Sequence, residues 1–213
     1  MSILIYAESA EGKFKKVAFE LASYAKKVAE TLSTTVTAVT VNAGDVSELS
    51  NYGVDKVLKV TNDQLATFSA KAYADVIKQA AQKEGSKVVI LSSTTDSIYL
   101  SSLVAVGLEA GFASNVVGLP VSTAPFQVKR TAFSNKAFNT TEINTEVKVL
   151  GIAKNSYGIF ENASSLTEED FNPTIDANDF GVKVTAVEKS SGKISIADAD
   201  IVVSAGRGMK GPE

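Results

Sequence analysis

The residues best suited to chemistry lie near the end of the 213-residue chain, where Gly206, Arg207 and Gly208 form a basic turn between Ser204 and Lys210. Two glycines around an arginine open backbone conformations that other residues avoid, and they let N–H groups approach an anion closely. The guanidinium keeps its charge beside a pyrophosphate or a reduced cofactor. The apolar run before the turn predicts a strand, and this arrangement is typical of cofactor sites in α/β proteins. An ordinary surface turn is the alternative interpretation.

Two further polar segments follow predicted strands. The run 92–97 (Ser-Ser-Thr-Thr-Asp-Ser) precedes a predicted helix, so its hydroxyls and the free helix N–H groups could bind phosphate. The simpler interpretation, which we favour, is a helix N-cap in a polar loop. The run from Tyr6 to Ser9 ends the first strand, at an edge where related folds hold adenosine. No glycine-rich fingerprint or P-loop accompanies it, so nucleotide binding is a minor alternative.

Basic residues with neighbouring phenylalanines occur within residues 126–138. They are Lys129, Arg130 and Lys136, beside Phe126, Phe133 and Phe138. Such a mixture could suggest single-stranded nucleic acid. Strand alternation instead places the phenylalanines in a core and the cations in solvent or on a partner. The net charge of −3 also disfavours a nucleic-acid partner, so none is predicted.

Composition excludes several classes of chemistry. The chain has no cysteine and no histidine, which removes disulfides, thiol nucleophiles and the most common general base and metal ligand. The acidic run Glu168–Asp170 is interpreted as a solvated loop, and no catalytic group or metal site is predicted. The sequence shows neither a secretory signal nor an apolar run of membrane-spanning length. We therefore expect a cytoplasmic protein without membrane insertion.

Alternating strands and helices predict an α/β fold, a Rossmann-like, mostly parallel sheet covered by helices. Strands are expected at 3–6, 35–41, 56–60 and 87–91, and helices at 13–32, 65–83 and 98–110. Asn62 is a candidate N-cap for the second helix, and Gly85 is its candidate C-cap. Closely spaced strands at 115–121, 126–133, 137–144 and 146–150 predict an antiparallel extension with a hairpin turn at 133–137. The polar segment 155–180 is the best linker candidate.

Four segments resemble those of electron transfer flavoprotein α subunits, and the resemblance covers all 213 residues in order. Met1–Glu8 resembles the family's first strand, and Asn51–Val57 its second helix-to-strand junction. Val128–Phe138 resembles its basic hairpin. Asp200–Glu213 resembles the start of its flavin-binding domain.

The resemblance implies a division of the chain. Residues 1–190 would be the N-terminal α/β domain, with an irregular acidic segment at 155–180, and 191–213 the start of an incomplete FAD-binding domain. Family members continue for about 100–150 residues more. The chain would then be truncated, and FAD would be bound in the intact complex but not retained by this portion. The corresponding arginine lies close to the flavin there, which makes Ser204, Gly206, Arg207, Gly208 and Lys210 the expected cofactor-binding residues.

The resemblance also implies a function, that of an electron carrier rather than an enzyme. The intact protein would pair with a β subunit, accept electrons from acyl-CoA or other dehydrogenases, and pass them to a quinone oxidoreductase or similar acceptor. This chain would supply the α–β contact domain. The alternatives are a freestanding adenine-nucleotide-binding α/β protein or sensor that uses Glu8 and residues 92–97, and a structural dimer without a ligand.

Overall fold

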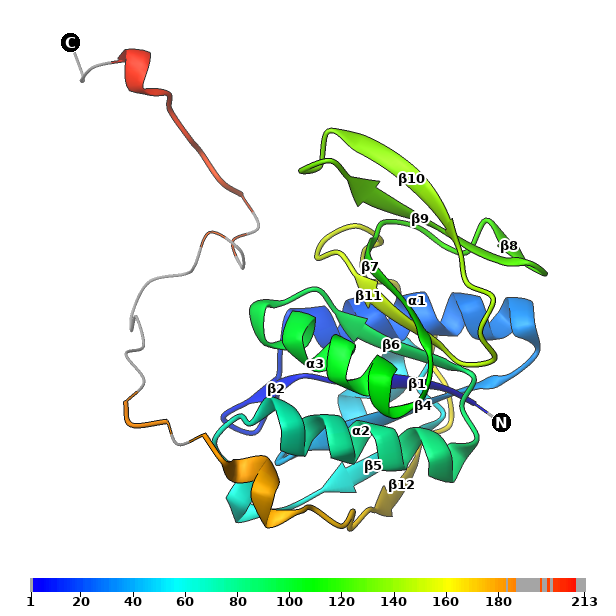
Figure 1. The fold of residues 1–213 in the computed structure, drawn as a ribbon, viewed down its shortest axis with the longest axis vertical. Coiled ribbons are helices and arrows are strands. Elements are labelled where there is room, and N and C mark those ends of the chain that lie inside the picture. Colours follow the sequence, from blue (N-terminus) through cyan, green and yellow to red (C-terminus); the bar gives the residue numbers. More distant parts are fainter. Residues whose placement is uncertain (1, 183, 187–195, 197–198, 200, 210–213) are drawn as a thin grey trace. The chain divides into compact units, whose positions relative to one another are not determined.

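The computed structural model describes residues 2–182, 184–186, 196, 199 and 201–209. It comprises two units, Met1–Lys183 and Val184–Glu213. The first unit is an α/β domain built on one ten-stranded sheet with helices on both faces (Figure 1). This architecture confirms the predicted fold class.

The centre of the sheet is parallel, in the order β5-β4-β1-β6-β11-β7. The strands are β5 Lys56–Val60, β4 Thr35–Val41, β1 Ser2–Tyr6, β6 Val88–Ser92, β11 Lys148–Ile152 and β7 Gly111–Val116. β1 and β6 are buried along their whole length, as strands covered on both faces must be. This burial on both faces explains why each of the two strands is a nearly continuous run of apolar residues in the sequence.

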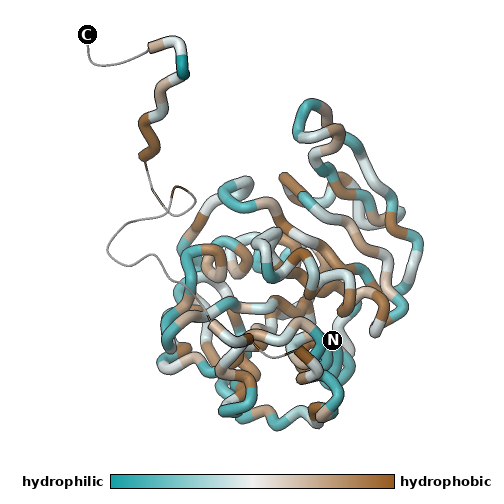
Figure 2. The backbone as a smooth tube through the Cα atoms, turned by 60° about the vertical axis from the view of Figure 1, so that its left-hand side comes forward, coloured by the Kyte–Doolittle hydropathy of each residue, from teal (hydrophilic) through white to brown (hydrophobic). Residues whose placement is uncertain are grey.

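Three α-helices cover the sheet. α1 (Lys16–Leu32) packs its apolar side on one face, while α2 (Ala70–Glu84) and α3 (Thr95–Gly107) cover the other (Figure 1). Fully buried residues such as Leu21 and Ile77 each stabilise the fold by about 1.5–3 kcal/mol. Hydrophobic residues therefore concentrate on the central strands, and hydrophilic residues on the outer turns (Figure 2).

The antiparallel extension is a narrow arm, defined as residues 122–142. It contains β8 (Ser122–Thr123), β9 (Phe126–Ala132) and β10 (Ala137–Glu142). The tight turn at 133–135 has positive φ at all three residues, which confirms the predicted hairpin. The expectation that 146–150 is antiparallel is wrong, because β11 runs parallel between β6 and β7. The expectation for 115–121 holds in part, because β7 is parallel to β11 but pairs antiparallel with β9 at Val116 and Arg130. β11 is almost wholly buried, as a central parallel strand should be.

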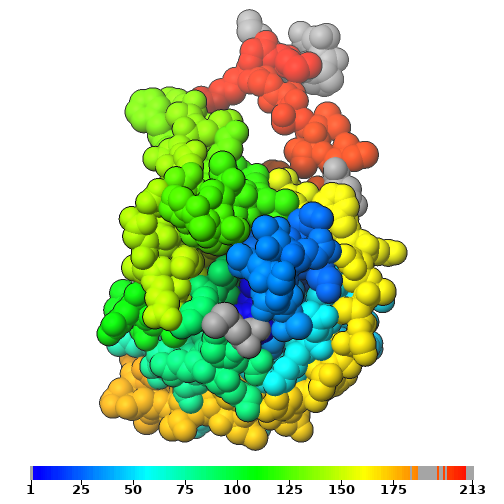
Figure 3. Space-filling model, turned by 90° about the vertical axis from the view of Figure 1, so that its right-hand side faces the viewer, coloured from blue at the N-terminus to red at the C-terminus, as the bar shows by residue number. Residues whose placement is uncertain are grey.

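The segment 153–180, here named the belt, is not a linker. Its strand β12 (Thr167–Asp170) pairs parallel with β5, so the acidic run 168–170 belongs to the sheet rather than to a solvated loop. Phe171, Ile175 and Phe180 then pack against the core below α2. The belt runs along one side and the bottom of the domain, in yellow and orange in Figure 3. Few but well-placed apolar residues therefore suffice to hold this polar segment.

Local capping shifts three helix boundaries from their predicted positions. α1 starts at Lys16 because Lys13–Phe14 (β3) pairs with Ser9–Ala10 (β2). Asn62 caps a 3-10 turn, η2 (Asp63–Leu65), and α2 begins only after Ser69. Gly85 ends α2 in the left-handed conformation, as predicted. α3 begins at Thr95 because the Thr94 side chain caps it. A second 3-10 helix, η1, spans Ser47–Tyr52.

The second unit is described only in part. Ile201–Ser204, predicted as a strand, has no strand structure, and these residues are exposed. A strand needs a neighbour for its backbone N–H and C=O groups, and none pairs with it among the described residues. A short 3-10 turn, η4, follows at Arg207–Met209. No helix in the described part of the chain is long and apolar enough to cross a membrane.

Candidate functional site

The crevice where open α/β sheets bind ligands lies where the strand order reverses, at the carboxyl ends of the strands. In this sheet that point lies between β1 and β6, since β1 leads through α1 to β4 on one side and β6 occupies the other. The structure brings the two predicted segments together at this point. Tyr6–Ser9 follows β1, and 92–97 follows β6.

The crevice is filled by the Glu8 carboxylate. Its Oε1 accepts hydrogen bonds from the hydroxyls of Ser92, Thr94 (2.9 Å) and Ser97 (2.8 Å). Its Oε2 accepts one from Lys15 Nζ at 3.0 Å. Glu8 is buried, although it carries a charge. These five residues form what we name the Glu8 network.

The Glu8 network sits at the N-terminus of α3. Thr94 Oγ1 accepts a hydrogen bond from Ser97 N at 3.3 Å, which confirms the N-cap interpretation of residues 92–97. The free N–H groups and dipole at a helix N-terminus favour a negative charge. Glu8 supplies that charge from within the chain, at the place where a phosphate would otherwise bind. A phosphate bound at residues 92–97, the alternative interpretation of that segment, would need the position that the Glu8 carboxylate takes.

The ionisation states in the crevice have clear causes. Burial acts to raise the pKa of Glu8, but hydrogen bonds from Ser92 and the charge of Lys15 outweigh it, so the pKa lies below its usual value. Burial raises the pKa of Tyr6 well above normal, and it raises the pKa of Tyr73 to about 12. Near neutral pH, Glu8 is therefore ionised and both tyrosines are neutral. A stable ion pair suits a structural role better than proton transfer, which needs a pKa near the working pH.

The basic turn predicted as a cofactor site lies in the second unit. Met209 N donates to the Gly206 carbonyl at 3.1 Å, which closes η4. A Cβ added at Gly206 or Gly208 would meet no atom within 4 Å, and Ser204 and Arg207 are exposed. The turn thus offers a cation and an open backbone, a donor set that fits an anionic cofactor. Lys210 lies outside the described residues.

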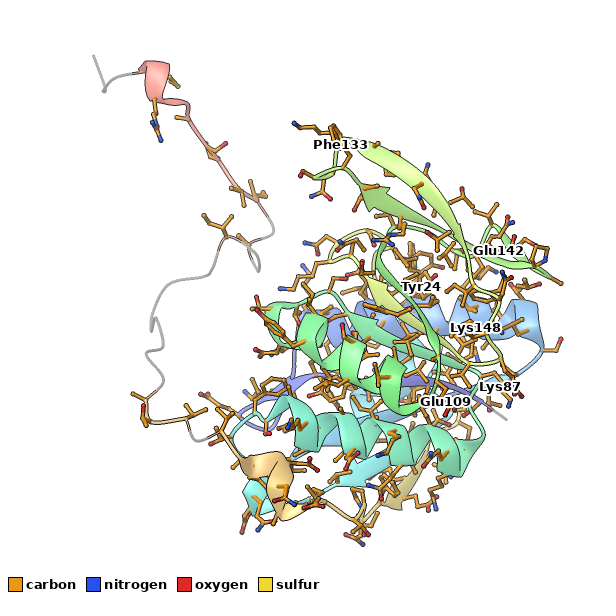
Figure 4. All side chains as sticks on the ribbon, viewed as in Figure 1. Tyr24, Lys87, Glu109, Phe133, Glu142 and Lys148 are labelled. Atoms are coloured by element: carbon orange, nitrogen blue, oxygen red, sulfur yellow. The ribbon has the colours of Figure 1, made fainter. Side chains whose placement is uncertain are left out.

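The arm carries aromatic residues on its surface. Lys129 Nζ lies 4.2 Å from the ring centre of Phe138, and Lys136 Nζ lies 5.6 Å from that of Phe133. The expectation that these phenylalanines lie in a core holds only for Phe126. Phe138 lies on the edge strand β10 and Phe133 in the hairpin turn at the tip (Figure 4), so both are exposed.

Sequence reasoning missed a second apolar surface, on α3. Ile98, Tyr99, Leu103 and Val106 are exposed on this helix, while Leu100 is buried. The signal was present in the sequence, because residues 98–106 have apolar side chains on every side of the helix. Such a helix is usually covered on both sides.

Among the residues that the structure describes, no group of three or more Asp or Glu side chains could hold a metal ion. The first unit is thus a domain of the helix-covered, mostly parallel α/β class, with a filled crevice and two exposed apolar surfaces.

Comparison with known proteins identifies the family within that class. The electron transfer flavoprotein domain matches residues 3–176, and the chain belongs to this family. It is 28% identical to the electron transfer flavoprotein subunit alpha of Syntrophomonas wolfei, over 98% of this chain and 66% of the relative. It is 26% identical to that of Thermoanaerobacterium thermosaccharolyticum, over 99% of this chain and 66% of the relative. These matches confirm the resemblance found in the sequence.

A more distant relative is a subunit of a larger enzyme. The chain is 23% identical to subunit LctC of a lactate dehydrogenase (NAD(+),ferredoxin) from Acetobacterium woodii, over 98% of this chain and 51% of the relative. The chain therefore spans about half to two-thirds of the length of these relatives.

Proposed function

We propose that the chain is the α-subunit component of a heterodimeric electron transfer flavoprotein, an electron carrier rather than a hydrolase or transferase. The observation that carries this proposal is the family match across residues 3–176. The Glu8 network supports it, because a crevice filled by the chain's own carboxylate suits a scaffold better than a small-molecule enzyme.

The partners follow from the same proposal. The chain pairs with a β subunit, and the complex takes electrons from acyl-CoA or other dehydrogenases and passes them to a quinone oxidoreductase or similar acceptor. The likeness to subunit LctC of a lactate dehydrogenase supports a dehydrogenase on the donor side. Residues 1–190 form the α–β contact domain, and residues 191–213 contain the first turn of the FAD-binding domain.

FAD is the cofactor of this proposal, and it supplies reversible acceptance and release of electrons when bound. Gly206 and Gly208 would let the backbone approach it closely, and Arg207 would hold a positive charge beside its anionic part. Ser204 and Lys210 are the neighbouring contributors. One turn supplies only a small part of a cofactor site, so we expect no tight FAD binding by residues 1–213 alone.

The test is association with the cognate electron transfer flavoprotein β subunit. Co-expression followed by analytical ultracentrifugation should give a one-to-one complex. A chain that sediments alone at micromolar concentrations of both partners would contradict the proposal. Saturable, tight FAD binding by the chain without its partner would contradict the assignment of most of the cofactor site to other parts of the complex.

A further inference from the structure

The exposed side of α3 is the largest run of uncovered apolar side chains on a helix in the described domain. The exposed fractions are 48% for Ile98, 68% for Tyr99, 38% for Leu103 and 79% for Val106. Tyr99, Leu103 and Val106 follow one another at four and three residues and so form one stripe along the helix, with Ile98 beside it. Exposing such a stripe to water is unfavourable, and contiguous apolar patches mark interaction sites.

The charges around this stripe are confined to its two ends. No charged residue occurs between Ser97 and Leu108. Asp96 precedes the stripe and Glu109 follows it, and both are exposed. Lys78 lies beside Gly107, but its ammonium group pairs with Asp75. The stripe is therefore an apolar centre with an acidic residue at each end, and Lys87, which lies near the Glu109 end, has its ammonium group paired with Glu146.

A surface hollow continues the stripe beyond Val106. It has a volume of about 400 Å³ and is lined in part by Gly107, Leu108 and Glu109 of the α3 end and by Lys87 and Val147 of the neighbouring strands. Figure 4 shows Glu109 and Lys87 close to each other beyond the end of α3. A hollow of this kind can accept one side chain of a partner, which fixes the partner's position along the helix.

The aromatic residues of the arm differ from this stripe. Phe133 and Phe138 each lie beneath a lysine ammonium group, which already covers part of each ring. Within the described part of the chain, no lysine or arginine covers the Tyr99 ring, and the side chains of Leu103 and Val106 have no polar group to solvate. Among the described surfaces, the α3 stripe therefore gains most from being covered.

We propose that the α3 stripe is the docking site for an amphipathic helix of the partner subunit, one with an apolar stripe flanked by lysine or arginine residues. This inference rests on the proposed function. α3 has 13 residues and is about 20 Å long, which suits helix-on-helix packing along its whole length. The basic flanks would meet Asp96 and Glu109, and such complementarity sets register and orientation.

The first experiment compares two valine substitutions in the full chain. Val106→Asp places a charge on the stripe, and Val182→Asp places one on a valine that is 83% exposed elsewhere in the domain. With the cognate β subunit, Val106→Asp should raise the dissociation constant by on the order of tenfold or more, because a desolvated charge would face apolar groups. Val182→Asp should leave it unchanged. Equal dissociation constants for Val106→Asp and the wild type would overturn the inference.

The second experiment tests the acidic ends. Glu109→Lys should weaken association by about threefold to tenfold at low salt, and the loss should shrink in high salt, because it arises from repulsion of a basic flank. Glu161→Lys, at an exposed glutamate of the belt, is the matched control. Tighter association of Glu109→Lys would show that the partner's flanks are acidic and would refute the stated chemistry.

A third measurement needs no substitution. Hydroxyl-radical oxidation of the Tyr99 ring should slow several-fold when the wild-type chain binds the β subunit, because the ring becomes covered. If the β subunit binds and Tyr99 oxidation is unchanged, the stripe is not the docking site although the proposed function stands. If the wild-type chain does not bind the β subunit, the proposed function fails together with the inference.

Discussion

At the scale of single residues, two buried carboxylates organise the domain. Glu8 joins the end of β1 to the start of α3 through hydrogen bonds from three hydroxyl groups. It also pairs with the ammonium group of Lys15, just before α1. Glu20, on α1, accepts backbone hydrogen bonds from Asn155 (2.9 Å), Tyr157 (2.9 Å) and Gly158 (3.1 Å). Each carboxylate is surrounded by donors, which offsets the desolvation of its charge. Each therefore behaves as a fixed structural link between distant segments.

Replacing Glu8 should destabilise the domain and change its acid sensitivity. Glu8→Gln removes the ion pair and presents an amide N–H₂ to donors, so the free energy of unfolding should fall by about 2–4 kcal/mol. Because the pKa of Glu8 is lowered in the folded state, its contribution is present above about pH 4.3 and is lost as the pH falls through the folded pKa. Urea denaturation between about pH 7 and 3 checks both effects, since the wild type should lose more stability than the variant. Parallel acid profiles would contradict this role.

Glu20→Ala should loosen the start of the belt. The substitution leaves three backbone N–H groups without their acceptor, which should cost about 2–4 kcal/mol of unfolding free energy. Glu30→Ala, at an exposed position on the same helix, should cost much less, because its contacts with Lys27 and Asn162 are open to solvent. Chemical denaturation of both variants gives the comparison. A similar loss of unfolding free energy in the two variants would mean that the buried hydrogen bonds of Glu20 stabilise the domain no more than exposed contacts do.

Arg207→Ala tests the basic turn in the complete flavoprotein complex. In the proposed site Arg207 lies beside the flavin, so removing its positive charge should lower the flavin's reduction potential, by on the order of tens of millivolts for a partly solvated charge. Arg207→Lys keeps the charge and should retain most of the potential. Spectroelectrochemical titration measures both variants. An unchanged potential in Arg207→Ala would remove this residue from the flavin environment.

At the scale of elements, the belt turns an acidic segment into an edge strand. Glu169 of β12 pairs with Lys56 of β5 and Lys83 of α2, both at 2.7 Å, and Glu168 pairs with Lys59. The hydrogen bonds from Lys56 and Lys83 lower the pKa of Glu169 to about 2. Charged residues on an edge strand also discourage pairing with another chain. The belt thus closes one side of the sheet and protects it.

The β12 strand should depend on these ion pairs. Glu169→Gln should speed hydrogen exchange of the backbone N–H groups of Thr167 and Phe171, which bond to Asp55 and Lys59 carbonyls. High salt should have a similar effect on the wild type, because the pairs are exposed and screened. Glu48→Gln, at an exposed glutamate in η1, is the control. If neither high salt nor Glu169→Gln changes these exchange rates, backbone pairing alone holds β12 in the sheet.

The sequence predicted those elements whose signals are local. β4 (Thr35–Val41) and β5 (Lys56–Val60) match their predicted bounds, since β-branched apolar runs are directly visible. The place of β11 between β6 and β7 was missed because strand order depends on contacts between residues far apart in the chain. The belt was missed for the same reason, since Glu20 and Lys56 lie more than a hundred residues before their partners. The Glu8 network was predicted in part, because the sequence placed Glu8 and residues 92–97 together in one possible ligand site but did not show the hydrogen bonds that join them.

At the scale of the whole molecule, the filled crevice sets this domain apart from nucleotide-binding proteins that share its architecture. An adenine-nucleotide sensor would need the space between β1 and α3 that Glu8 occupies. The apolar stripe on α3 and the family match favour association with other proteins instead. The filled crevice and the exposed stripe of the first unit therefore support the proposed association with a partner subunit.

Adenine nucleotides should therefore leave the stability of the domain unchanged. A ligand that binds only the folded state raises the melting temperature as its concentration increases. We expect no rise with AMP or ATP at millimolar concentrations, measured by differential scanning calorimetry without the β subunit. A concentration-dependent rise would restore the sensor interpretation and would place the nucleotide outside the Glu8 network.

The carboxylate in the crevice also makes the negative charge at the α3 N-terminus independent of any dissolved ligand. A dissolved ligand stabilises its protein only as far as its concentration exceeds the dissociation constant, so starvation can unload it. Glu8 is attached to the same polypeptide, and its effective concentration at the α3 N-terminus is fixed by the short connection from β1. The domain therefore carries a counter-ion for the α3 N-terminus that dilution cannot remove.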